Sequence, residues 1–194
     1  LMDLPSIPIY ALNYTMEILK MQLALDKVEA NNLHVIKPNM KLTFGDNSIF
    51  PLRVTHSIPD ATLYVLNTKD GSIVYSGDFI FDPTMQGNFS SDIGKLAYIG
   101  KQNVLCLMTE SMYAEKPGFT SPKHRVASFI RSVLHDNENR IIMSVLPAHI
   151  YRIQEIFDEV SKTNRKIVIM GKMLQDIINM SLEGKYLTIN QNKI

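Results

Sequence analysis

The sequence predicts an α/β protein with two parts that differ in how strands and helices follow one another. In residues 1–112, short predicted strands come close together and are joined by tight turns, which is typical of hairpins. In residues 121–194, predicted strands alternate with helices, which favours a parallel sheet with right-handed crossovers. Residues 113–120 separate the two patterns and are interpreted as a domain linker.

The first part opens with a predicted helix and continues with short strands. Apolar side chains recur at helical spacing from Leu12 to Val28, so this segment is expected to be a helix with a broad apolar face. Asp70-Gly71 is a hairpin signal between two apolar runs. The expected strands are Leu33–Ile36, Lys41–Phe44, Ser48–Val54, Thr62–Asn67 and Ser72–Tyr75, and Asp92–Ile99 is an expected short helix.

A continuous apolar run at Val104–Met108 predicts a strand that is buried on both faces. It contains Cys106, the single cysteine, which we expect to be a buried reduced thiol in a cytoplasmic protein without disulfides.

The second part begins with a predicted helix start at Ser121 and Pro122, with Ser as the N-cap and Pro at the first helical position. His124, Arg125 and Arg131 lie opposite the apolar stripe of that helix and are expected to form a solvated face. The elements that follow are strand Arg140–Leu146, helix Ala148–Ser161, strand Lys166–Met170 and helix Met173–Glu183.

Overall charge and hydropathy narrow the classes of function. The 194 residues carry a formal net charge of +1, which argues against a non-specific RNA coat protein but not against an enzyme with a local basic groove. No apolar run approaches the roughly 18 residues of a membrane span, so no membrane partner is expected.

One histidine and one aspartate stand where predicted strands end. His56 lies in Leu-Arg-Val-Thr-His-Ser-Ile-Pro-Asp, residues 52–60, and Asp78 follows 22 positions later in Tyr-Ser-Gly-Asp-Phe. A neutral imidazole and a carboxylate, each at a strand end, suit a catalytic zinc site. A lone histidine is more often structural, so spacing alone leaves both interpretations open.

Three motifs, in their order and spacing, resemble ribonuclease J. They are Thr-His-Ser-Ile-Pro-Asp around His56, Gly-Asp-Phe around Asp78, and Val-Leu-Cys-Leu-Met-Thr-Glu-Ser at residues 104–111. Ribonuclease J belongs to the β-CASP branch of the metallo-β-lactamase superfamily. The resemblance runs from about Pro5 to about Leu187. It implies a partial metallo-β-lactamase αββα sandwich, followed by the first part of a β-CASP parallel α/β domain.

The resemblance also implies a role for each motif. The family has a zinc ligand at the position of His56 and, at that of Asp78, a carboxylate that bridges two zinc ions. Glu110 matches an acidic residue near the catalytic centre, usually Asp in ribonuclease J. Two metals about 3.5–4 Å apart generate hydroxide from water and stabilise the attacking and leaving oxygens of a phosphodiester. The implied activity is hydrolysis of RNA by metal-bound hydroxide, with two zinc ions as cofactor.

The chain departs from the family pattern in two places. The family's main metal motif, His-x-His-x-Asp-His, is absent, since no two of the five histidines are two residues apart. After strand 140–146 the family commonly reads Ala-Ser-Asn-x-His-Arg, whereas residues 147–152 read Pro-Ala-His-Ile-Tyr-Arg. A loop that leads from a strand into a helix is a natural phosphate site, so Arg152 is a candidate RNA contact. A solvated surface arginine is the alternative.

Three functions stay open on these observations. The chain is expected to be an internal fragment of a zinc-dependent ribonuclease, lacking the metal motif and the C-terminal part. The alternative is a non-catalytic ribonuclease J-like partner subunit that keeps the fold for assembly or RNA binding. A small-molecule hydrolase of the same superfamily is the third, and the β-CASP-like second half counts against it. Partners beyond RNA would be a second copy in a homo-oligomer or a ribonuclease J-type subunit.

Catalytic zinc needs about three protein ligands. His56 and Asp78 are two, and Glu110 adds at best a weak third. The 194 residues alone are therefore expected to bind zinc poorly and to cleave RNA negligibly.

Overall fold

The computed structural model describes residues 7–112, 114–118 and 126–194. The chain divides into two units. The first comprises Leu1–His56 and Asp60–Pro122, and the second comprises Ser57–Pro59 and Lys123–Ile194. The linker expected at residues 113–120 falls partly outside the described residues and stays a prediction.

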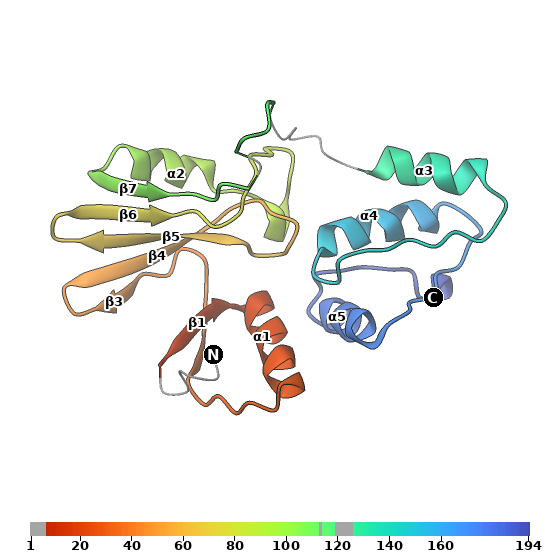
Figure 1. The fold of residues 1–194 in the computed structure, drawn as a ribbon, viewed down its shortest axis with the longest axis horizontal. Coiled ribbons are helices and arrows are strands. Elements are labelled where there is room, and N and C mark those ends of the chain that lie inside the picture. The colour runs from red at the N-terminus through yellow and green to blue at the C-terminus, as the bar shows by residue number, and fades with distance from the viewer. Residues whose placement is uncertain (1–6, 113, 119–125) are drawn as a thin grey trace. The chain divides into compact units, whose positions relative to one another are not determined.

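A five-stranded sheet forms the main body of the first unit (Figure 1). The strands from β3 to β6 pair antiparallel with their neighbours, and β7 pairs parallel with β6. Each predicted strand of this sheet is confirmed to within one residue at either end. In spatial order the strands are β3 (Leu42–Phe44), β4 (Asn47–Arg53), β5 (Thr62–Thr68), β6 (Gly71–Tyr75) and β7 (Val104–Met108).

Gly71 explains why the hairpin between β5 and β6 closes where the sequence predicts. Its φ is +142°, and a Cβ atom there would meet the carbonyl oxygen of Asn103 at 2.7 Å. Asn103 holds the turn, because its side-chain amide donates to the Asp70 carbonyl at 2.9 Å and its own carbonyl accepts the Ser72 N–H at 2.8 Å. Only glycine gives this close approach without a clash.

The inner strands of the sheet carry its buried core. Leu52 on β4 lies opposite Leu63 on β5, and Val65 on β5 lies opposite Val74 on β6. Each of these four side chains is at most 4% exposed. Because cross-strand partners point to the same side of a sheet, the four form one buried face.

β7 contradicts the burial predicted from its apolar run. Leu105 and Leu107 are 54% and 63% exposed, and Cys106 is exposed as well. β7 is an edge strand whose sheet neighbour is β6. The predictions of a strand buried on both faces and of a buried Cys106 thiol are therefore wrong for this structure. An apolar run reports hydrophobicity, whereas burial depends on which elements cover the two faces.

Two short parallel strands and a helix form a second, smaller sheet unit within the first unit. β1 (Ile9–Leu12) pairs with β2 (Leu33–Ile36), and α1 (Asn13–Leu25) connects them. The predicted helix is confirmed, but it ends three residues before Val28. Lys27 takes a left-handed φ of 55°, and the Val28 N–H bonds back to the Leu23 carbonyl at 2.9 Å, which closes the helix.

The polar segment between β6 and β7 contains a 3₁₀ turn at Gly87–Phe89 and α2 (Ile93–Gly100). The side chain of Asp92 caps α2 by accepting the Lys95 N–H at 3.2 Å, so the predicted short helix is confirmed.

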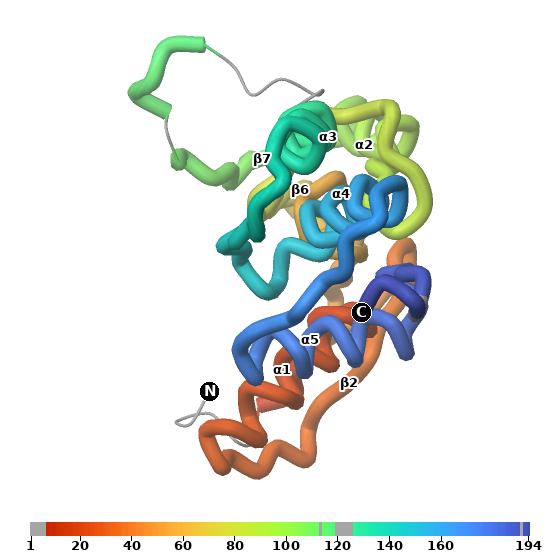
Figure 2. The backbone as a smooth tube through the Cα atoms, turned by 90° about the vertical axis from the view of Figure 1, so that its right-hand side faces the viewer, coloured from red at the N-terminus to blue at the C-terminus, as the bar shows by residue number. Residues whose placement is uncertain are grey.

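The second unit consists of helices α3 (Ala127–Asp136), α4 (Ile150–Ser161) and α5 (Lys172–Glu183), with a 3₁₀ turn at Gln191–Lys193. α3 and α4 lie side by side (Figure 2). Ile130 and Leu134 of α3 and Val160 of α4 form a buried cluster between them, and Ile141 and Ile167 pack against it. The helices expected at 148–161 and 173–183 are confirmed. The helix start at Ser121 and Pro122 lies outside the described residues.

The strands expected at 140–146 and 166–170 do not form in the described part of the second unit. Both segments contribute an isoleucine to the buried cluster, but Ile142 is 91% exposed and Val168 is 82% exposed. The apolar pattern of a strand is thus present without a ladder of backbone hydrogen bonds. A strand needs a neighbouring chain segment to satisfy its backbone groups, whereas a helix satisfies its own.

Candidate metal-ligand positions and helix-terminal arginine

The directions of the strands bring three candidate residues to one end of the first unit's sheet. β4 and β6 are both antiparallel to β5, so they run the same way, and β7 runs parallel with β6. His56 comes three residues after the end of β4, Asp78 three after β6 and Glu110 two after β7. All three therefore follow strands that end on the same side of the sheet.

Hydrogen bonds beyond the strand ends tie these segments together. Thr55, next to His56, forms an isolated antiparallel bridge with Ile80, and its carbonyl accepts the Ile80 N–H at 2.9 Å. Ser76 lies two residues before Asp78 and donates its N–H to the Met108 carbonyl at 2.9 Å. The sheet is thus extended toward the candidate positions.

Thr55 itself is fully buried. Its N–H donates to the hydroxyl oxygen of Ser91 at 2.7 Å, and the two hydroxyls are 2.9 Å apart. This fixes the backbone at the residue that precedes His56.

The candidate side chains differ in their surroundings. Asp78 and Glu110 are exposed and His56 is half-buried. Glu110 accepts the Met112 N–H at 2.6 Å through Oε2, so it stabilises the turn after β7. The described residues contain no group of three His, Cys, Asp or Glu side chains arranged to hold a metal ion. The three positions therefore follow strands that end on one side of the sheet, but the described residues do not form a complete metal site.

Two further aspartates stand beside prolines, where the sequence indicates turns. Asp82 accepts both the N–H and the hydroxyl of Thr84 through Oδ1, at 2.9 and 2.6 Å, which is the expected turn bond. Asp60 has a left-handed φ of 55° and lies 3.0 Å from Nη2 of Arg53. Burial raises the pKa of the Asp60 carboxyl, and the charge of Arg53 opposes that rise. The ion pair with Arg53 is a feature that the turn pattern did not reveal.

Arg152 lies in the first turn of α4, where backbone N–H groups and the helix dipole favour anions. Its Nη1 is 3.1 Å from Oε2 of Glu155, a buried residue one turn further along the helix. Burial and the positive charge of Arg152 lower the pKa of His149, which directly precedes α4. The described contacts thus give Arg152 a structural partner, and its contact with RNA stays a prediction.

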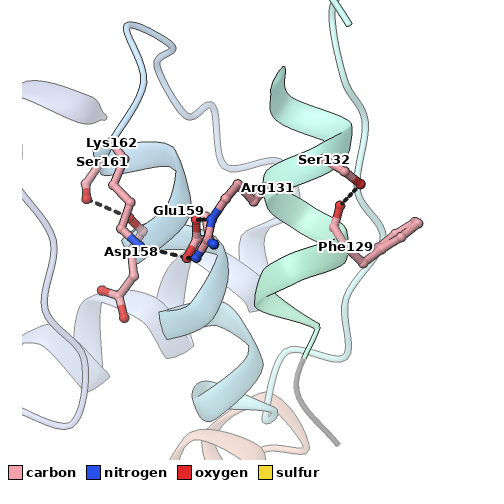
Figure 3. Close-up of polar contacts among 7 residues, drawn as sticks. All are labelled: Phe129, Arg131, Ser132, Asp158, Glu159, Ser161 and Lys162. Carbon is pink, nitrogen blue, oxygen red and sulfur yellow. Dashed lines mark hydrogen bonds and ion pairs between the residues drawn. The ribbon is translucent and has the colours of Figure 1, made fainter. Parts of the chain in front are cut away.

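The Arg131 side chain is 63% exposed, in agreement with a solvated face, but it also has a partner on α4. It forms two hydrogen bonds with the Glu159 carboxylate, Nε–Oε2 at 2.9 Å and Nη2–Oε1 at 3.0 Å, and links α3 to α4 (Figure 3). Lys162 adds a third contact at 2.7 Å. These partners lower the pKa of the Glu159 carboxyl to about 2. His124 and Arg125 lie outside the described residues.

A family model and curated relatives both match this chain to ribonuclease J. The family described as "Ribonuclease J, beta-CASP domain" matches residues 138–194. Ribonuclease J2 of Bacillus subtilis is 34% identical over 183 residues, which cover 94% of this chain and 33% of that relative. Ribonuclease J 2 of Streptococcus pyogenes serotype M3 is 30% identical over 191 residues, covering 97% of this chain and 34% of the relative.

The chain is a homologue of ribonuclease J. It spans about a third of the length of the curated relatives that it matches. A crystal structure of a protein of unknown function from Enterococcus faecalis has the same fold over 96% of this chain and 45% of its own length. The TM-score is 0.66 at 19% sequence identity, so this likeness concerns the fold alone.

No helix among the described residues of this ribonuclease J homologue is both long enough and apolar enough to cross a membrane.

Proposed function

We propose that this ribonuclease J homologue is part of a zinc-dependent ribonuclease that hydrolyses RNA phosphodiesters. His56 and Asp78 would bind zinc, and Glu110 would lie near the reacting phosphate. The main support is the shared direction of β4, β6 and β7, which places the three residues after strands that end on one side of the sheet. Ligands from the ends of separate strands allow a site to be built on a rigid scaffold.

The chemistry of the donors agrees with zinc, but their number does not suffice. Imidazole nitrogen and carboxylate oxygen are ordinary zinc ligands, and a catalytic ion takes three of them from the protein. The described residues hold no such group of three. The proposal therefore requires ligands beyond the described residues. Zinc, when bound, supplies an activated water and neutralises charge on the phosphodiester.

Arg152 is the residue of the second unit that we propose to contact the RNA backbone. Its ion pair with the buried Glu155 holds the guanidinium in the first turn of α4. A phosphate there would meet both the guanidinium and the positive end of the helix dipole. Arg152→Lys would keep the charge but lose the planar fork, so RNA binding is expected to weaken more than charge alone predicts.

The proposal is tested with the chain alone and with a graft. In the graft, the 194 residues replace the matching third of Bacillus subtilis ribonuclease J2. We expect the isolated chain to bind zinc weakly in calorimetric titration and to leave a 5′-labelled RNA intact. The graft is expected to bind zinc and to degrade the RNA. His56→Ala and Asp78→Asn are each expected to abolish that degradation.

His135→Ala is the matched control, because His135 is exposed and its described ion-pair partner is the neighbouring Asp136. Cooperative thermal unfolding of each graft shows that it has folded. Tight binding of two zinc ions by the isolated chain would show that these 194 residues already contain a complete set of zinc ligands. Degradation that survives His56→Ala would contradict the role of His56.

The second candidate is a non-catalytic ribonuclease J-like partner subunit. The observation in its favour is the incomplete ligand set among the described residues. A graft that folds and binds RNA, but degrades it no faster after zinc is added, would favour this function over the enzyme.

A further inference from the structure

Three rings from β1, β2 and β3 lie in contact in the first unit. Tyr10 of β1 and His34 of β2 are partners in the parallel ladder, and their rings stack with centroids 4.9 Å apart and planes 22° apart. Phe44, the last residue of β3, meets the Tyr10 ring edge to face at 5.6 Å. Residues from three strands thus form one ring cluster, Tyr10–His34–Phe44.

The outer part of this ring cluster is open to solvent. His34 is exposed and Phe44 is 42% exposed, whereas Tyr10 between them is half-buried. One face of the His34 ring covers Tyr10, so the other face is presented outward. A stack of rings with an open end is a surface that a further planar ring can extend.

Two cations lie between His34 and Phe44 in the sequence. Lys37 directly follows β2, and Lys41 directly precedes β3. Both are exposed, and neither forms an ion pair within the described part of the chain. Stacking rings combined with unpaired lysines match a ligand that carries both planar bases and phosphates.

We infer that Tyr10, His34 and Phe44 form a stacking surface for an unpaired base of single-stranded RNA, with Lys37 and Lys41 near its phosphates. The inference rests on the proposed function, because RNA is the ligand that it names.

The stacking surface lies apart from the candidate metal positions. Phe44 pairs with Asn47 at the start of β4, whereas His56 follows the other end of that strand. The six residue steps from Asn47 to Arg53 span about 20 Å at the usual rise of a strand. The surface would therefore bind RNA at a distance from the reacting phosphate and would add affinity rather than chemistry.

The test measures equilibrium binding of a 5′-labelled 12-nucleotide oligouridine by fluorescence anisotropy, in EDTA, with the full 194-residue chain. Phe44→Leu and His34→Gln remove a ring at each position, and each is expected to weaken binding about tenfold. His34→Tyr keeps a ring at this position and is therefore expected to keep the affinity for the oligouridine. Lys37→Gln and Lys41→Gln are each expected to lower the salt dependence of binding by about one phosphate contact.

Two controls separate stacking from general effects. An abasic strand of the same length keeps the phosphates but offers no bases, so the ring variants should bind it as the unmodified chain does. Val35→Ala changes a residue that is 50% exposed and points to the other face of β2, and it should leave binding unchanged. Thermal unfolding midpoints identify any variant that fails to fold.

Equal binding of the oligouridine by the unmodified chain and by folded Phe44→Leu and His34→Gln variants would overturn the inference. So would a failure of the unmodified chain to bind the oligouridine, or an equal loss of affinity for the abasic strand. Because these measurements need no zinc and no cleavage, they are separate from the test of the proposed function. If the His56→Ala chain binds the oligouridine but cleaves no RNA, the stacking surface is supported independently of the proposed zinc site.

Discussion

The two units of this chain satisfy their backbone hydrogen bonds in different ways. In the first unit, β3 to β6 are joined by hairpins or pair with the next strand along the chain, and β7 adds a parallel neighbour. In the second, α3, α4 and α5 form, but the apolar segments at 140–146 and 166–170 stay without a ladder. Helices and hairpins need only local partners, whereas a parallel sheet needs distant ones.

The cores of the two units differ correspondingly. The first unit buries a continuous face of aliphatic side chains on its inner strands. The second buries apolar side chains of α3, α4 and α5 together with an acidic residue, Glu159, which is 4% exposed and is held by Arg131 of α3 and by Lys162 directly after α4. The stability of an apolar core changes with the size of its side chains, whereas the stability of an ion-paired link also changes with pH. Substitutions and pH therefore affect the stabilities of the two units differently.

The largest effect is expected in the core of the first unit. Leu52→Ala removes a side chain with no exposed surface and should lower the free energy of unfolding of that unit by about 3 kcal/mol. Hydrogen exchange followed by mass spectrometry, in increasing denaturant, reports β4–β6 and α4 separately. Peptides from β4–β6 should lose protection, and those from α4 should keep it.

Leu107→Ala is the matched control for Leu52→Ala. Leu107 lies on the same sheet face, opposite Val74, but is 63% exposed, so its loss should cost less than about 0.5 kcal/mol. Equal costs for the two leucines would mean that the β7 face is covered in solution. Equal loss of protection in α4 would mean that the two units unfold together.

A smaller effect is expected from the ion pairs of the second unit. Glu159→Gln removes the charge that Arg131 and Lys162 bind and should lower the free energy of unfolding of this unit by about 1 kcal/mol, since solvent screens the exposed cations. Asp158→Asn, one residue earlier on the same helix, should have almost no effect. Chemical denaturation monitored at α3 and α4 by hydrogen exchange provides the measurement, and a larger loss in Asp158→Asn would refute the assignment.

A smaller effect still is the change of that difference with pH. The pKa of Glu159 is about 2 in the folded chain against an ordinary value of 4.5. Because the folded value is lower, its stabilising contribution is complete above about pH 4.5 and is lost as the pH falls toward 2. The difference between the unmodified chain and Glu159→Gln should therefore shrink across that window, and a constant difference would contradict the lowered pKa.

Asp60 gives the opposite sign in the first unit. Burial raises its pKa above the ordinary 3.8, although Arg53 opposes the rise. Its contribution to stability is therefore present below about pH 3.8 and is lost as the pH rises through the higher folded value. Asp60→Asn should gain stability relative to the unmodified chain over that rise. A relative loss would show that the Arg53 ion pair outweighs burial.

The sequence by itself determined most of the local structure. Turn residues and alternating apolar residues located β3 to β6, because hairpins depend on neighbours that are close in the chain. Helical spacing located α1, α4 and α5 for the same reason. β1 was missed, since four residues between Pro8 and a helix carry too little pattern. The motifs around His56, Asp78 and Glu110 also indicated the ribonuclease J homology, because each motif is an uninterrupted stretch of sequence.

Only the tertiary structure decided which apolar segments are covered and which charges meet. Leu105, Leu107 and Ile142 are apolar in sequence but exposed, because burial depends on what packs against a segment. Arg131 and Glu159 are 28 residues apart, and no spacing rule joins them. The shared sheet end of His56, Asp78 and Glu110 follows from strand direction. The stacking of Tyr10 on His34 follows from the parallel pairing of β1 with β2, two strands that a helix separates in the chain, and Phe44 meets Tyr10 from β3.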